Sequence, residues 1–86
     1  MKTAVIGGRE VAAGFALAGV SCTKVCTEIW EAKSALKEFA HRNDIGVILI
    51  ENNYAEDMQK EIESLMQVRD SYPLIIAIPS YADKKW

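Results

Sequence analysis

The chain has 86 residues, with ten Lys and Arg against twelve Asp and Glu, and half of its residues are hydrophobic. This length suits one domain and leaves little room for a deep substrate cleft with a lid, which disfavours a solitary multi-step enzyme. A net charge of −2 gives no positive field that could hold a phosphate backbone, so we expect no nucleic-acid partner. The hydrophobic fraction of 50% and the charged fraction of 26% are ordinary for globular proteins and exclude a disordered chain.

The start of the chain carries no pattern typical of a targeting or membrane-spanning segment. The opening MKTAVIGG has one Lys and a very short apolar run before its glycines, unlike a signal peptide. The apolar stretch 11–20 is interrupted by Gly14 and Gly19, and it is well short of the roughly 20 apolar residues that cross a bilayer. We therefore expect a cytoplasmic chain without membrane insertion, whose association with any membrane is peripheral.

The first part of the chain alternates strand and helix patterns. Lys2–Gly7 is a short β-branched and apolar run that predicts a buried strand, and Glu10–Ala18 predicts a short helix that Gly19 ends. This helix has almost no polar face, so we expect it to be covered on more than one side, by its own sheet and neighbours or by a partner. Thr23–Cys26 alternates Lys with Val, which predicts a half-exposed edge strand.

The next helix pattern is clearly amphipathic. Thr27 is its predicted N-cap, and Glu28 and Glu31 suit the positive end of the helix dipole. The apolar face repeats at three- and four-residue spacing: Ile29, Ala32, Leu36, Phe39 and Ala40. Ile45–Ile50 follows as a nearly continuous β-branched run, which predicts a central parallel strand.

A third helix is predicted from Ala55 to Met66, and a last buried strand over Leu74–Ile78, closed by Pro79. The outer face of that helix is acidic, with Glu56, Glu61 and Glu63 among its residues. Four strands then alternate with three helices. Right-handed crossovers favour one α/β domain over residues 1–86, with an open parallel sheet in the order 2-1-3-4 and helices on both faces.

The glycine pair after the first strand is the only feature that suggests a small-ligand loop. It has neither the G-x-G-x-x-G spacing of a dinucleotide site nor the G-K-[ST] of a P-loop, so a tight turn at Gly7 and Gly8 is favoured. A receiver domain would need clustered acids after the first strand and an Asp after the third. Gly8, Arg9 and Glu10 stand at the first place and Glu51 at the second, which disfavours phosphotransfer.

No arrangement of residues predicts catalysis, a cofactor or a metal. His41 is the single His, at the end of a helix where a cation suits the dipole, and it has no nucleophile beside it. Cys22 and Cys26 cannot complete a four-ligand zinc site and are predicted to be free thiols.

A contact surface is the remaining possibility. Trp30 lies off the apolar stripe of its helix, which fits either a contact anchor or a partly covered surface Trp. With Val25, Ile29 and Lys33 it forms one predicted patch beside the edge strand. The acidic helix face is the rival surface, although exposed ion pairs contribute only about 0 to 1 kcal/mol each.

Four segments carry a family resemblance that spans the chain: KTAVIG at 2–7, GFALAGV at 14–20, DIGVILI at 44–50 and PLIIAIP at 73–79. With these segments the chain resembles the F subunit of the V-type and A-type ATPases. The resemblance implies the same α/β fold and a non-catalytic part of the central stalk. It also implies binding to the coiled-coil D subunit, and through it to the catalytic A/B hexamer, in a motor that couples ATP hydrolysis or synthesis to proton or sodium transport.

The chain departs from the family pattern in two ways. Gly8 and Ala16 stand where family members often have an acidic and a basic residue. Family members also continue into a further helix after the fourth strand, which is not present in this chain, so the chain is either a shortened form or a naturally short member. The alternative to a stalk component is a stand-alone flavodoxin-like domain that binds a small ligand or regulates another protein.

Overall fold

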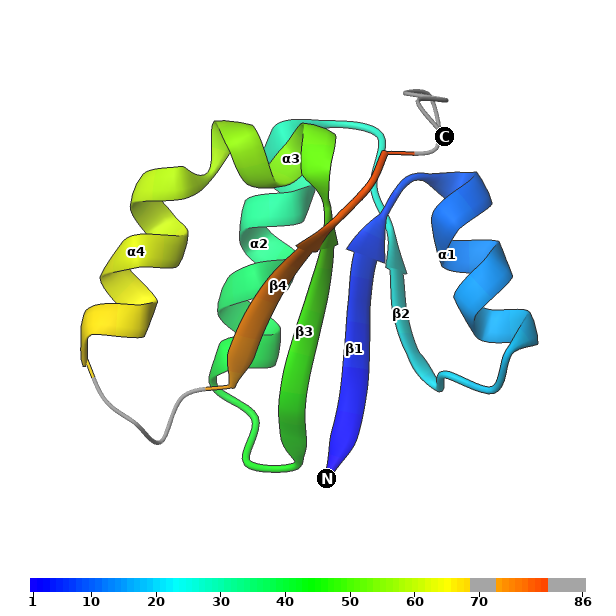
Figure 1. Ribbon diagram of the computed structural model, residues 1–86, viewed down its shortest axis with the longest axis horizontal. Coiled ribbons are helices and arrows are strands. Elements are labelled where there is room, and N and C mark those ends of the chain that lie inside the picture. Colours follow the sequence, from blue (N-terminus) through cyan, green and yellow to red (C-terminus); the bar gives the residue numbers. More distant parts are fainter. Residues whose placement is uncertain (69–72, 81–86) are drawn as a thin grey trace.

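The computed structural model describes residues 1–68 and 73–80. In chain order the elements are β1 (Lys2–Gly7), α1 (Arg9–Leu17), β2 (Cys22–Val25), α2 (Ile29–Ala40), β3 (Ile45–Glu51), α3 (Asn52–Asp57), α4 (Gln59–Val68) and β4 (Leu74–Ile78). All strand pairs are parallel, and the sheet order is β2-β1-β3-β4, which confirms the predicted α/β fold and strand order (Figure 1).

The helices cover the two faces of the sheet unequally. In Figure 1, α1 lies on one side of the strands, and α2 and α4 lie on the other. α1 packs over β1 and β2, whereas α2 contacts β1 and β3, and α3 and α4 contact β4. Among the described residues, the α2 side therefore carries three helices and the α1 side carries one.

The main core lies between the sheet and α2, α3 and α4. Its buried side chains are Ala4, Ile6, Cys26, Ala32, Ala35, Leu36, Phe39, Ile45, Ile48, Ile50, Ala55, Met58 and Ile75. Ile48 and Ile50 of β3 are completely buried, which confirms that the β-branched run forms the centre of the sheet. The two cysteines are free thiols, as predicted.

The prediction of one continuous third helix was wrong. The structure has two helices, α3 and α4, which meet at Met58, where φ is −119° and ψ is 21°. The Met58 side chain is completely buried, so the change of direction lets the chain turn over the core at this point. Met66 was expected on the core stripe, but its side chain is 53% exposed on α4.

Smaller differences concern where elements begin and end. β2 is Cys22–Val25, one residue earlier than predicted, and it forms one edge of the sheet. Gly19 follows α1 with a φ of 105°, in the left-handed region that favours glycine, as expected for a residue that ends a helix. Within residues 1–68 and 73–80, no helix is long and apolar enough to cross a membrane. The expected lack of a further helix after the fourth strand concerns residues 81–86, which lie outside the described residues.

Candidate partner-binding surface

The four residues of the predicted patch lie at the end of β2 and in the first turns of α2. Val25 is 50% exposed and Trp30 is 66% exposed, so two large apolar side chains stand in solvent at this place. Ile29 is different, because it packs partly against the main core. The exposed apolar part of the patch is therefore Val25 and Trp30.

The start of α2 is held by the carboxylate of Glu31. The sequence had indicated for this residue only a favourable interaction with the positive end of the helix dipole. Glu28, not Thr27, is the N-cap residue, so the predicted cap was wrong. Glu31 Oε1 accepts hydrogen bonds from the backbone N–H of Thr27 at 2.8 Å, the Thr27 hydroxyl at 3.0 Å and the backbone N–H of Glu28 at 3.1 Å. These hydrogen bonds lower the pKa of Glu31, and the bond from the Thr27 backbone has the largest effect. The turn that carries Trp30 is thus fixed at its base.

Tyr54 fixes the same loop from the other side, and no sequence pattern pointed to it. This residue comes from α3, and its hydroxyl donates a hydrogen bond to the carbonyl of Cys26 at 2.6 Å. Burial raises the pKa of the Tyr54 hydroxyl. The loop between Val25 and Ile29 is therefore anchored to α3, although Tyr54 is 28 residues from Cys26 along the chain.

Lys33 is engaged within the chain. Its Nζ lies 3.3 Å from Glu61 Oε2, which joins α2 to α4. Glu56, another residue of the acidic face, accepts a hydrogen bond from the Asn52 side chain at 3.1 Å. Parts of the rival acidic surface are thus already used by side chains of the same chain.

The glycine pair does not form an open anion site. Glu51, at the end of β3, is 4% exposed, and its Oε1 accepts a hydrogen bond from the backbone N–H of Gly8 at 2.7 Å. Gly8 is the N-cap of α1, where a phosphate would meet the positive end of the helix dipole. A carboxylate of the chain itself occupies that position. Among the described residues, no three His, Cys, Asp or Glu side chains gather into a potential metal site.

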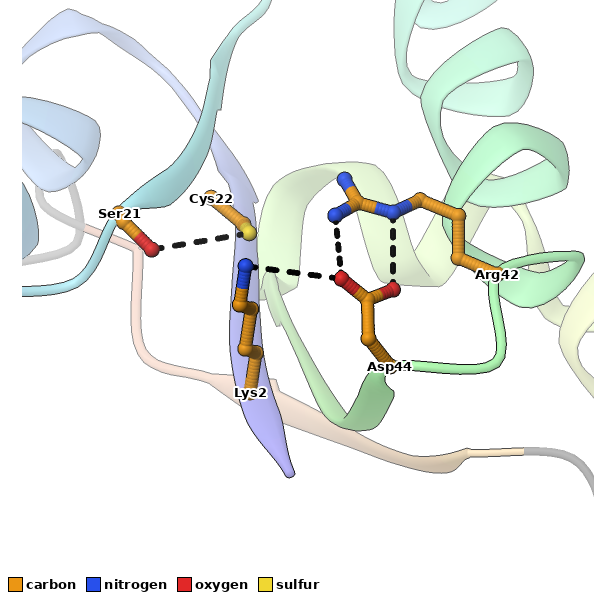
Figure 2. A network of polar contacts seen from close by, with 5 residues as sticks. All are labelled: Lys2, Ser21, Cys22, Arg42 and Asp44. Atoms are coloured by element: carbon orange, nitrogen blue, oxygen red, sulfur yellow. Dashed lines mark hydrogen bonds and ion pairs between the residues drawn. The ribbon is translucent and has the colours of Figure 1, made fainter.

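A second polar network lies at the opposite, amino-terminal edge of the sheet (Figure 2). Arg42 makes a two-pronged contact with Asp44, with Nε to Oδ1 at 3.0 Å and Nη2 to Oδ2 at 2.7 Å. Lys2 Nζ lies 3.6 Å from the same carboxylate, whose pKa is lowered chiefly by the hydrogen bonds from Arg42. Lys2 also donates its backbone N–H to the carbonyl of Asp44 at 2.7 Å. These contacts tie the start of β1 to the turn before β3 and are structural.

The architecture and the sequence agree with one family. A family model described as ATP synthase (F/14-kDa) subunit matches residues 3–85. The chain belongs to the F-subunit family of A-type and V-type ATP synthases. The resemblance drawn from the four sequence segments is thereby confirmed, and the family places the chain with components of an ATP synthesis and ion transport complex.

Individual relatives of this F-subunit chain come from archaea and a eukaryote. The F subunit of the A-type ATP synthase of Thermococcus gammatolerans is 35% identical over all of this chain and 81% of its own length. The F subunit of the V-type proton ATPase of Dictyostelium discoideum is 36% identical over 90% of this chain and 71% of its own. The crystal structure of the V-type ATP synthase F subunit of Archaeoglobus fulgidus superposes with a TM-score of 0.70 at 25% identity, over 90% of this chain and 95% of that one.

Proposed function

We propose that this chain is a non-catalytic component of the central stalk of a rotary ATPase. In this role it binds the coiled-coil D subunit at the cytoplasmic face of the membrane. Through that partner it couples the A/B hexamer to proton or sodium transport. The observation that carries the proposal is the family match over residues 3–85. The relatives are named as subunits, which supports a function exercised inside a larger assembly.

The non-catalytic role is supported by the position of Glu51. Its carboxylate lies at the amino end of α1, so an incoming phosphate would meet a negative charge where nucleotide-binding folds offer free N–H groups. A stand-alone small-ligand domain, the alternative drawn from the sequence, would need that position. We expect no ATP hydrolysis by the isolated chain, since phosphoryl transfer needs groups that hold and neutralise the phosphates. Hydrolysis that follows the protein peak through extensive purification would contradict this expectation.

The docking surface that we propose for the D subunit is the patch Val25, Ile29, Trp30 and Lys33. Trp30 supplies a large apolar side chain on a turn that Glu31 and Tyr54 hold in place. An anchor on a rigid turn loses little side-chain and loop freedom on binding, which favours affinity. Lys33 lies on the rim of the patch and is already paired with Glu61 of the same chain, so we expect it to contribute less to binding than Trp30.

Calorimetric titration of the chain with the D subunit of the same ATPase tests the proposal. Loss of a buried Trp anchor costs about 2 kcal/mol or more, so Trp30→Ala should weaken binding at least roughly thirtyfold. Met66→Ala is the matched control, because Met66 is also an exposed apolar side chain but lies on α4. Thermal unfolding should show that both variants stay folded.

Two results would count against this assignment in different ways. Absence of binding between the parent chain and the D subunit would contradict the stalk function itself. Unchanged affinity for Trp30→Ala, with a large loss on charge reversal at Glu61 and Glu63, would move the docking surface to α4.

A further inference from the structure

Within residues 1–68 and 73–80, the α1 side of the sheet is covered over only half of its width. Val47 and Leu49 of β3 pair in register with Leu74 and Ile76 of β4, so these four side chains face the same side, next to α1. Val47 and Leu49 are half-buried, whereas Leu74 is 54% and Ile76 is 41% exposed. We call these four residues the open strip. Parallel sheets of this kind normally have helices over both faces, and here α1 packs over β1 and β2 instead.

The outer surface of α1 is apolar as well. Leu17 is 90% exposed, and Ala13 and Ala16 are also exposed. The charged residues of this helix, Arg9 and Glu10, are confined to its first turn. The sequence predicted that such a helix would be covered on more than one side. Within the described residues, its own sheet covers one side, and Leu17 remains in solvent.

A groove separates α1 from β4. Its volume is about 440 Å³, and its apolar lining includes Val11, Gly14, Phe15 and Ile78. A Cβ atom built on Gly14 would meet nothing within 4 Å, so this side of α1 is open to close approach by another helix. Ile78 of the groove follows Ile76 of the open strip by two residues on β4, so both face the same side and the groove adjoins the strip.

We infer that two copies of the free chain associate around a two-fold axis, with α1 of each copy lying over the open strip of the other. The strip is two strands wide, about 10 Å, which is the diameter of one helix. A two-fold axis parallel to the strands places both α1 helices side by side in one layer between the two sheets. The same contact then forms twice, as in any symmetric dimer.

The surface chemistry of the chain supports a second copy as the occupant. The strip needs an uncharged apolar helix, and α1 beyond its first turn is such a helix. No other described part of the chain covers its outer face. The four strip residues carry no charge, so two copies meet without repulsion between them. Glu10, on the rim of the groove, is the exception. The two-fold axis places the Glu10 side chains of both copies in the same layer, where their like charges repel each other. We therefore expect a dissociation constant on the order of 10 μM rather than nanomolar.

Sedimentation equilibrium over about 5 to 500 μM tests the inference on the chain as it exists. The parent chain should move from the monomer mass toward twice that mass. Leu17→Lys and Ile76→Lys should each weaken the association at least roughly tenfold, because each places a charge in the apolar layer. The control is Met66→Lys, which adds the same charge at a 53% exposed apolar residue on α4, and it should associate like the parent. Leu17 is 90% exposed in the single chain, so its replacement should not act by unfolding it.

A mixing experiment makes the test specific to α1 over the strip. Leu17→Lys and Ile76→Glu should each stay monomeric at concentrations where the parent is dimeric, because each buries an unpaired charge in the contact. Equimolar mixing should restore dimers through the new Lys and Glu pair. A monomer mass for the parent throughout the range would overturn the inference. So would association that Ile76→Lys weakens and Leu17→Lys does not, because that result indicates edge pairing of β4. None of these outcomes involves the D subunit, so they are independent of the proposed stalk function.

Discussion

Glu51 and Gly8 are 43 residues apart in the chain, yet the Glu51 carboxylate accepts a 2.7 Å hydrogen bond from the Gly8 backbone N–H. The second oxygen of the same carboxylate accepts a 3.0 Å hydrogen bond from the buried hydroxyl of Ser80. One buried side chain at the end of β3 therefore joins the turn after β1 to the segment after β4. This carboxylate holds the carboxyl-terminal edge of the sheet together.

Replacement of this carboxylate should strongly destabilise the fold. Glu51→Ala leaves the half-buried Gly8 N–H and the buried Ser80 hydroxyl without their partner, and a fully buried group left in this way costs about 1 to 3 kcal/mol. We expect a total loss of about 2 to 5 kcal/mol in the free energy of unfolding, measured by urea denaturation. Glu56→Ala, at an exposed acid of α3, is the control and should stay within about 0.5 kcal/mol of the parent. Equal midpoints for the two variants would contradict the structural role of Glu51.

Replacement of glycine by alanine should have opposite effects on the free energy of unfolding at two positions, one before α1 and one within it. A Cβ on Gly7 would lie 3.0 Å from Glu51 Oε1 and 3.1 Å from Val11 Cγ1, so Gly7→Ala should be destabilising. A Cβ on Gly14 meets nothing within 4 Å, and Ala is the better helix former by about 1 kcal/mol, so Gly14→Ala should stabilise the chain. Urea denaturation at low protein concentration compares them. A stabilising Gly7→Ala would show that Glu51 does not approach Gly7 as closely as described.

Patterns within single segments were enough to predict most of the fold. Ile45–Ile50 is typical of a buried strand because most of its residues are β-branched, and the structure buries Ile48 and Ile50 completely. The strand order followed from right-handed crossovers between parallel strands. The break at Met58 could not be predicted in this way, because the apolar spacing around it continues the helical period and the break depends on how Met58 enters the core.

The candidate surface was predictable only in part. The exposure of Trp30 follows from its position off the apolar stripe of α2, and the structure agrees. The residues that hold this surface could not be found from the sequence, because Tyr54 acts on Cys26 across 28 residues and Lys33 pairs with Glu61 on another helix. The role of Glu51 was hidden for the same reason. A Glu after a strand looks like part of a polar turn until its partners are known.

Truncation in the centre of the sheet tests which face of β3 carries the core. Ile48 is completely buried toward α2, so Ile48→Ala should cost about 2 to 5 kcal/mol. Val47 is the adjacent residue, half-buried on the α1 side, and Val47→Ala should cost clearly less. Thermal unfolding of both variants is the measurement. A Val47→Ala variant as unstable as Ile48→Ala would indicate that the α1 side is also fully packed, against the open strip described above.

The stability of the turn that carries Trp30 should depend on pH through Glu31. Hydrogen bonds from the Thr27 backbone and then from Glu28 lower the pKa of Glu31 below its ordinary value of 4.5. A carboxyl with a lowered pKa in the folded state stabilises the fold fully above that ordinary value, and its contribution is lost as the pH falls through the folded pKa. Glu31→Gln can still accept the same hydrogen bonds but carries no charge. The parent should therefore melt at a higher temperature than this variant near neutral pH, and the difference in melting temperature, the gap, should shrink as the pH falls from about 6 toward 3.

Glu38→Gln removes a charge from the exposed face of the same helix, and its gap to the parent is the reference for a general charge effect. A gap for Glu31→Gln that follows the Glu38→Gln gap at every pH would show that the carboxylate at the start of α2 has no special role.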